Sequence, residues 1–174
     1  MAIEPDTKDW TWVLDRPCDE CGFDASTVDP PQIPQMLRAN TRGWSTALGR
    51  AGVGVRPDPR VWSTLEYACH VRDVHRLFDQ RVMLMLTEDD PVFTSWDQDE
   101  VAVREAYHLQ DPVSVELELI EAAGAVAGRY AGVSGEEWER SGRRADGAAF
   151  TVRTLARYHL HDVGHHLNDV GCTS

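Results

Sequence analysis

Apolar residues recur at helical spacing along four stretches of the chain. The first stretch runs from about Pro34 to Arg50, and its proline suits the first turn of a helix. Its apolar positions are Ile33, Met36, Leu37, Trp44, Ala47 and Leu48. Glycines and prolines of residues 52–59 predict a loop after this helix.

The second stretch opens with a capping box in the segment Ser63-Thr64-Leu65-Glu66. The serine is the expected N-cap, the glutamate stands three positions later, and the helix should end near Thr87. Its apolar face comprises Tyr67, Val71, Val74, Leu77, Phe78, Val82 and Met85.

The third helix should start at Asp111-Pro112, a cap followed by a proline, and continue through Tyr130. Ser134–Glu137 forms a second capping box that predicts a short helical turn. The fourth helix should begin near Thr151 and end by Gly171, since glycine suits the position after a helix.

The connecting segments carry little strand signal, because alternating runs are few and none is paired by a short turn. Residues 88–111 form a long connection with a short helix over Glu100–Tyr107, and Arg140–Ala149 is a polar, glycine-rich loop. The sequence therefore predicts an all-α fold, with a four-helix bundle over residues 31–174. Residues 1–30 form an irregular N-terminal arm that packs on the bundle, because its tryptophans require burial.

The composition fits one ordinary globular domain of 174 residues. Its net charge of −12 disfavours binding to nucleic acids or to anionic membranes. The sequence has no run of 18 apolar residues, so it predicts no membrane span. The first residues are acidic and lack the pattern of a signal peptide. We therefore expect a cytoplasmic protein.

Histidines bring chemistry to the fourth helix. His161 and His165 stand four residues apart, so both imidazoles lie on one face and can reach a single ion. A catalytic zinc-type site needs a third protein ligand and an open position. His70, which borders the apolar face of the second helix, is the best third candidate, whereas His75 has the wrong phase.

A helical wheel places His161 and His165 at the edge of the apolar stripe of the fourth helix. This position predicts a site on the rim of the bundle that opens to solvent. His159 and His166 lie nearer the stripe and are interpreted as packing histidines, with His166 also an additional candidate ligand. The alternative is that no metal binds and that all these histidines are packing or surface groups.

Cys18 and Cys21 form a CxxC that is similar to half of a zinc knuckle. The sequence offers no second CxxC to complete four ligands, and a redox role would need a βαβ unit. Two reduced cysteines in a turn are the favoured interpretation. Cys69 and Cys172 are interpreted as packing residues, although Cys69 precedes the candidate ligand His70.

Three further residues are candidates for binding a substrate: Asp97, Arg143 and Arg144. The carboxylate of Asp97 could lie near the mouth of the site, although a helix N-cap at Asp97 or Asp99 is the favoured interpretation. The two arginines could bind a carboxylate, or could simply be solvated in their polar loop.

Two segments resemble the DinB-like superfamily, which includes mycothiol-dependent maleylpyruvate isomerases and bacillithiol S-transferases. Residues 62–70, which end in His70, are similar to the metal-ligating segment of that family's second helix. Residues 161–166 are similar to its HxxxH segment. The resemblance spans residues 30–170 and implies an up-down-down-up bundle that holds zinc or nickel through three residues.

The resemblance also implies that dimers are frequent and that the metal activates a low-molecular-weight thiol, since a metal-bound thiol is deprotonated at neutral pH. The arm with its CxxC lies outside the family core, and the extra substrate-binding domain of the isomerases is not in this sequence. The first hypothesis is therefore a thiol S-transferase that uses mycothiol on a small electrophile, with His70, His161 and His165 as ligands. The alternative is a non-catalytic or stress-associated protein in which the ion links the second and fourth helices.

Overall fold

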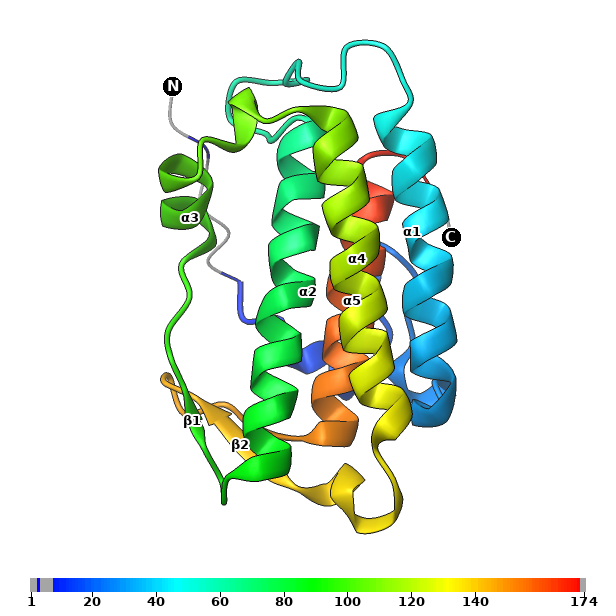
Figure 1. The fold of residues 1–174 in the computed structure, drawn as a ribbon, viewed down its shortest axis with the longest axis vertical. Coiled ribbons are helices and arrows are strands. Elements are labelled where there is room, and N and C mark those ends of the chain that lie inside the picture. Colours follow the sequence, from blue (N-terminus) through cyan, green and yellow to red (C-terminus); the bar gives the residue numbers. More distant parts are fainter. Residues whose placement is uncertain (1–2, 4–7, 173–174) are drawn as a thin grey trace.

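The computed structural model describes residue 3 and residues 8–172. Most of these residues are helical, as the sequence predicts. The long helices are α1 (Ile33–Leu48), α2 (Thr64–Thr87), α4 (Pro112–Gly132) and α5 (Val152–Asp169). These four helices pack side by side as a bundle (Figure 1).

The helices do not simply alternate in direction. In Figure 1, α1 and α5 run upward, whereas α2 and α4 run downward. Because the neighbours α2 and α4 are parallel, the chain between them must return along the whole length of the bundle. This return is the long connection over residues 88–111.

Side-chain caps fix where three of these helices begin. Ser63 and Glu66 form both hydrogen bonds of the capping box at α2. Asp111 accepts a hydrogen bond from the backbone of Ser114 at α4, and Thr151 forms a capping box at α5. The predicted starts of α2, α4 and α5 are thus confirmed, since caps satisfy backbone N–H groups that the helix itself leaves unpaired.

A small sheet at one end of the bundle was missed by the sequence interpretation. It has the order β1-β2-β3, from β1 (Val92–Phe93), β2 (Ser141–Arg144) and β3 (Ala149–Thr151). β1 pairs parallel to β2, and β2 pairs antiparallel to β3. The prediction of a loop over Arg140–Ala149 is therefore wrong. Strands of two to four residues are too short to show a regular alternation.

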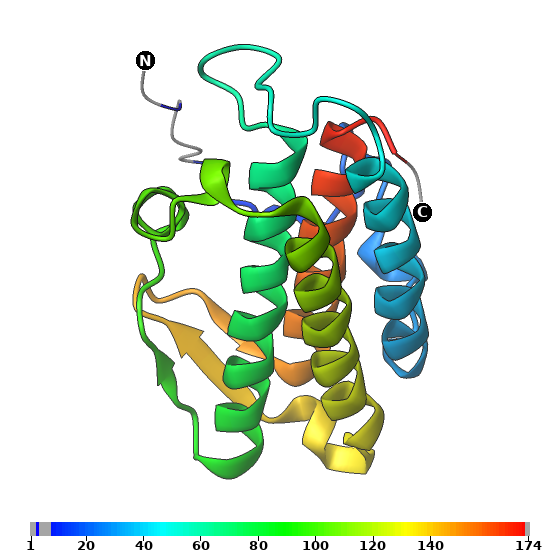
Figure 2. The same ribbon diagram turned by 45° about the horizontal axis from the view of Figure 1, so that its top comes forward.

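The connection between α2 and α4 carries the short helix α3 (Gln98–Arg104) and the 3₁₀ turn η4 (Tyr107–Leu109). The predicted short helix over Glu100–Tyr107 therefore exists, but it begins and ends earlier. Figures 1 and 2 show α3 beside α2, outside the bundle. This position places the segment before α3 along the same side of α2 as the candidate site.

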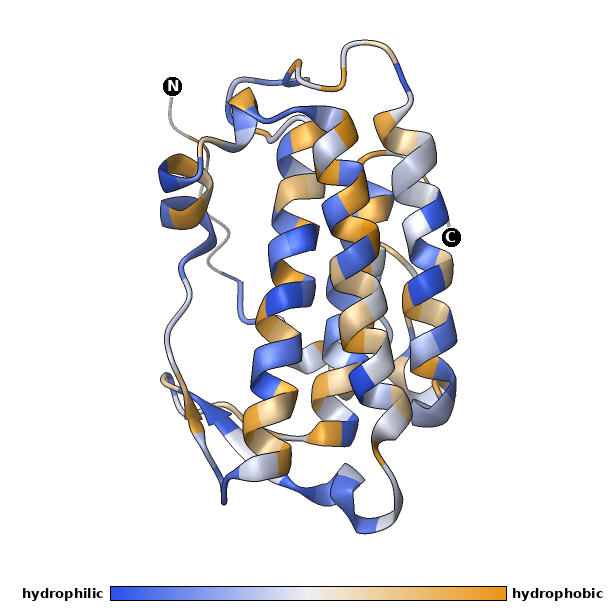
Figure 3. Cartoon of the chain, viewed as in Figure 1, coloured by the Kyte–Doolittle hydropathy of each residue, from blue (hydrophilic) through white to orange (hydrophobic). Residues whose placement is uncertain are grey.

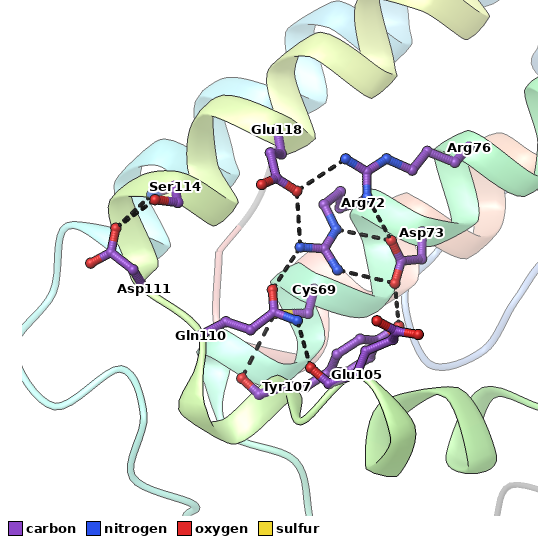
Figure 4. A network of polar contacts seen from close by, with 10 residues as sticks. All are labelled: Cys69, Arg72, Asp73, Arg76, Glu105, Tyr107, Gln110, Asp111, Ser114 and Glu118. Carbon is purple, nitrogen blue, oxygen red and sulfur yellow. Dashed lines mark hydrogen bonds and ion pairs between the residues drawn. The ribbon is translucent and has the colours of Figure 1, made fainter.

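Polar contacts attach the end of this connection to α2 and α4 (Figure 4). Arg72 donates to the side chains of Gln110, at 2.7 Å, and Glu118, at 3.2 Å. The hydroxyl of Tyr107 donates to Asp73 at 2.6 Å. Cys69 lies in this network, with its Sγ 3.5 Å from Gln110, which accounts for a buried thiol on α2.

The arm contains the 3₁₀ turns η1 (Thr11–Leu14), η2 (Ala25–Thr27) and η3 (Pro30–Gln32). All three turns pack against α5, and the arm buries Val13 and Cys18 in the core. The turn η3 leads directly into α1. The arm therefore covers α5 on the side away from α4.

Hydrophilic and hydrophobic residues alternate in bands along the visible long helices (Figure 3). Such bands are typical of amphipathic helices that bury one face. Within the described part of the chain, none of the helices combines the length and the apolar composition of a membrane span.

Candidate metal centres

Helix α5 carries two pairs of potential ligands, each with the i, i+4 spacing that places two side chains on one face. One pair is His161 and His165, and the other is Asp162 and His166. The pairs are one residue apart, which corresponds to a rotation of about 100° around the helix axis. They therefore point toward different neighbours.

Asp162 and His166 meet His70 of α2. One ligand atom from each of these three residues lies within 4.8 Å of the other two. Oδ1 of Asp162 is 3.8 Å from Nε2 of His70 and also 3.8 Å from Nε2 of His166. His70 is almost completely buried, at 1% exposure, whereas Asp162 and His166 are half-buried.

Three buried donor atoms of His70 and Asp162 lack the hydrogen bonds that buried polar atoms normally have. Neither ring nitrogen of His70 has a hydrogen-bond partner, and neither does Oδ1 of Asp162. Leaving a buried polar atom unpaired costs about 1–3 kcal/mol. Two N or O ligands of a tetrahedral zinc ion lie about 3.4 Å apart, so a divalent cation fits these residues with only a small inward movement.

Neighbouring side chains hold this group in place. Asp169 accepts a hydrogen bond from Nδ1 of His166 at 2.9 Å, which leaves Nε2 of that ring directed at Asp162. Trp62 and Trp96 pack against His70, with ring centroids 5.2 Å and 5.5 Å away. A carboxylate behind a histidine ligand is the usual way in which proteins orient a metal-binding imidazole.

Burial also sets the charges of the three candidate ligands. Burial, with His166 nearby, lowers the pKa of His70 well below its ordinary value, so this imidazole is neutral and keeps a lone pair for an ion. Burial raises the pKa of Asp162 because the carboxylate loses hydration. A bound cation would compensate that lost hydration directly.

His161 and His165 meet the arm instead. Their ligand atoms form a second group with Cys18 and Cys21, again within 4.8 Å of one another. Sγ of Cys18 lies 3.7 Å from Nδ1 of His165. Burial, reinforced by His165, lowers the pKa of His161 to about 4, and burial raises the pKa of Cys21 to about 11.

A cavity of about 940 Å³ borders both groups. The arm, α2, residues 94–99, residues 144–146 and α5 all contribute to its walls. Asp162 and His166 of the first group line it, and so do His161 and His165 of the second. Its apolar lining includes Trp10, Trp62, Phe78, Trp96 and Tyr158.

The sequence profile of the DinB superfamily matches residues 35–170 of this chain. The chain belongs to the DinB superfamily. Comparison with curated proteins gives no match. Among solved structures, the fold is similar to that of YfiT from Bacillus subtilis, which is described as a probable metal-dependent hydrolase with an unusual four-helix bundle topology. The TM-score is 0.72 at 18% identity, covering 82% of this chain and 85% of YfiT.

The DinB bundle does not bring the three predicted ligands to one point. His70, His161 and His165 were expected to share an ion, but the structure groups His70 with Asp162 and His166 and places the other two against the arm. Successive residues of α5 are rotated by about 100° around the helix axis. The face with Asp162 and His166 therefore points toward α2, and the face with His161 and His165 does not.

Sequence reasoning missed Asp162 and gave His166 only a secondary role. The signal was the i, i+4 pair Asp162/His166, which has the same spacing as the histidine pair. His159 was expected to be a packing histidine, and it is fully buried, with its Nε2 3.0 Å from Nδ1 of His75. Cys69 lies in the network with Gln110 and is in neither group.

The three predicted substrate-binding residues have different surroundings. Asp97 caps α3 by accepting from the backbone of Asp99 and Glu100, as the alternative interpretation proposed, and it also lines the cavity. Arg144 lines the cavity and pairs with Asp146 at 2.5 Å. Arg143 pairs with Asp90 and is not among the lining residues.

Arg81 is a cavity residue that sequence reasoning did not select. It is 8% exposed, lines the cavity and lies over the rings of Phe78 and Phe93, at 5.5 Å and 5.3 Å. Burial lowers the pKa of Arg81 to about 10, which still leaves the guanidinium charged at neutral pH. No sequence signal marked it, since an arginine in a helix is ordinarily a surface residue.

Proposed function

We propose that this DinB-superfamily protein is a metal-dependent enzyme that transforms a small molecule in the cavity beside His70, Asp162 and His166. This proposal rests mainly on the convergence of these three residues beside a cavity of about 940 Å³. Three buried atoms of His70 and Asp162 have no hydrogen-bond partner there. Three protein ligands with a position left for substrate or water are typical of catalytic sites.

The donor set, two imidazoles and one carboxylate, fits a divalent ion such as zinc or nickel. When bound, the ion would act as a Lewis acid and lower the pKa of a coordinated water or thiol. His70 and His166 provide lone pairs, Asp162 provides negative charge, and Asp169 fixes the orientation of His166. Trp62 and Trp96 keep bulk water away from His70.

The proposed reaction is the transfer of a low-molecular-weight thiol of the mycothiol type to a small electrophile. The cavity volume supports this proposal, because pockets of roughly 300–1,000 Å³ hold drug-sized ligands, and two small reactants fit at the upper end of that range. Arg81 provides positive charge in the cavity for an anionic group of either reactant, whereas Arg144 is already paired with Asp146.

Hydrolysis is the second candidate. Two histidines and one carboxylate also form the ligand set of zinc peptidases that activate water. YfiT, which shares the fold, is described as a probable metal-dependent hydrolase. Hydrolysis would need the same three ligands but no thiol.

One set of assays separates these reactions. The metal-loaded protein is incubated with an electrophile panel, with and without mycothiol, and with a panel of small esters and amides. Thiol-dependent product supports the transferase, and thiol-independent cleavage supports the hydrolase. His70→Ala should lose activity together with one bound ion, whereas replacement of the exposed His108 of η4 by Ala should keep both.

A bound ion without either activity would contradict catalysis and support the alternative. In that case the ion would only link α2 to α5, through His70 on one helix and Asp162 and His166 on the other. An intact protein that takes up no metal after reconstitution would contradict both proposals.

A further inference from the structure

The second ligand group joins two parts of the chain that are far apart in sequence. Cys18 and Cys21 come from the arm, and His161 and His165 come from the last helix. Together they offer two sulfur and two nitrogen donors, the set that closed structural zinc sites use. The proposed function does not employ any of the four.

A tight turn in the arm brings the two cysteines together. The backbone N–H of Cys18 donates to the carbonyl of Phe23, and that of Gly22 donates to the carbonyl of Cys18, both at 2.8 Å. Gly22 has a φ of +75°, a conformation that favours glycine. The turn thus directs both thiols toward α5.

The histidines present suitable atoms to these thiols. His161 is 3% exposed, and its Nε2 is buried without a hydrogen-bond partner. Nδ1 of His165 faces Cys18, while its Nε2 lies 3.5 Å from Glu20 and 3.6 Å from Asp169. Carboxylates on the outer nitrogen orient a metal-bound histidine in the same way as at other metal sites.

One of the donor separations matches zinc coordination. With Zn–S of about 2.3 Å and Zn–N of about 2.05 Å, a sulfur and a nitrogen at tetrahedral positions lie about 3.6 Å apart. The observed separation between Cys18 and His165 is 3.7 Å. Trp10 and Phe23 pack against the imidazoles, with centroids 4.7 Å and 5.4 Å from His165 and His161, respectively. These rings cover part of the surface of the two imidazoles.

We propose that Cys18, Cys21, His161 and His165 bind a structural zinc ion that fastens the N-terminal arm to α5. The fastened arm forms one wall of the cavity, because Lys8, Trp10 and Glu20 line it. The zinc ion would therefore shape the substrate cavity without contacting the substrate. It is distinct from the ion proposed at His70.

X-ray absorption of zinc-reconstituted His70→Ala tests this directly. This variant keeps all four proposed ligands and removes one from the other group. We expect about one tightly held zinc ion per chain, with two sulfur ligands at about 2.3 Å and two nitrogen ligands at about 2.0–2.1 Å. The intact protein should hold about two ions per chain, with the average sulfur count per zinc halved.

Cys18→Ser/Cys21→Ser should lose the sulfur signal and one ion while keeping the ion at His70. Because that variant could misfold, alkylation of the unmodified protein gives a second measurement. Cys18 and Cys21 should be protected from iodoacetamide in the zinc form and modified after chelation. A zinc signal without sulfur in folded His70→Ala, alkylation unaffected by zinc, or a Cys18–Cys21 disulfide in the reconstituted protein would each overturn the proposal.

Discussion

Asp169 contacts one histidine of each ligand group. One oxygen, Oδ2, accepts from Nδ1 of His166, and the other, Oδ1, lies 3.6 Å from Nε2 of His165. Asp169 belongs to neither ligand group, so it orients the rings without being a ligand itself. Its carboxylate thereby links a side chain of the proposed catalytic group to one of the proposed structural group.

Replacing Asp169 by Asn should weaken metal binding while leaving the fold intact. The amide has the shape of the carboxylate but lacks its negative charge. That charge favours the form of His166 that has its proton on Nδ1 and a free lone pair on Nε2. We expect an affinity loss of about 10–100-fold at the group of His70. Competition with a chromophoric chelator measures this. Asp89→Asn, in the exposed turn after α2, is the control, and equal affinities in the two variants would refute the orienting role.

At the residue scale, the sequence identifies where metal chemistry lies but not how it is divided. The cluster of residues 159–166 and His70 are visible in the sequence. Two i, i+4 pairs one residue apart are equally compatible with a helix, and only packing decides which pair faces α2 and which faces the arm. The link between Cys18 and His165 spans 147 positions, and no local pattern could reveal it.

At the scale of elements, the start of α2 depends on Glu66. Its carboxylate accepts from the backbone of Ser63 at 2.8 Å and from Nε of Arg56 at 2.9 Å. Burial alone would raise the pKa of Glu66, but the hydrogen bonds from Arg56 and Ser63 outweigh burial and lower it. The helix that carries His70 is thus fixed at its first turn by a charged group.

Glu66→Gln should destabilise the protein in a pH-dependent manner. Because the pKa is lower in the folded state, the charged form stabilises the fold at neutral pH, and that contribution disappears as Glu66 is protonated below about pH 4.3. We expect a loss of about 1–3 kcal/mol at pH 7. Urea unfolding at pH 7 and at lower pH measures it. A difference between the two proteins that stays constant with pH would contradict the mechanism.

The short sheet depends on Gly142 of β2. A Cβ at this position would lie 2.7 Å from Cζ of Phe93 and 2.8 Å from Cγ of Met85, both of which are buried. Gly142→Ala should therefore cost about 1–3 kcal/mol of unfolding free energy. Gly128→Ala, on α4, is the matched control, because a Cβ at that position has no atom within 4 Å. This variant should raise the unfolding free energy by up to about 1 kcal/mol. Equal effects in urea unfolding would show that the contact is unimportant.

The starts of α2, α4 and α5 were predictable from the sequence because their caps are local. Ser63, Asp111 and Thr151 each bond to the backbone or side chain three residues ahead. The sheet was not predictable, because β1 and β2 are paired across about fifty residues and neither strand is long enough to alternate. Local hydrogen bonds thus made these helix starts predictable, whereas the sheet depends on pairing between residues that are distant in sequence.

At the scale of the whole molecule, the proposed ions would connect elements that are distant in sequence. One would join α2 to α5, and the other would join the arm to α5. Metal binding should therefore stabilise the tertiary structure as a whole, since a site assembled from several elements does not exist in the unfolded chain.

The melting temperature should rise with zinc. At a free zinc concentration of about 100 times Kd, one site contributes about 2.7 kcal/mol, or about 5–10 °C for a chain of this size. Differential scanning calorimetry with buffered zinc, compared with chelator-treated protein, measures the shift. A variant that carries both His70→Ala and Cys18→Ser/Cys21→Ser is the control and should melt at the same temperature in both conditions. A zinc-independent melting point of the unmodified protein would contradict metal-linked stability.

The turn at Cys18–Cys21 also affects how far the N-terminus of this protein can be truncated. The family profile starts at residue 35, yet the arm before it packs on α5 and provides a wall of the cavity. A chain trimmed to the family span would keep His161 and His165 but would uncover their imidazoles and remove Trp10 from the cavity. The unit that folds and encloses the cavity is therefore larger than the segment matched by the family profile.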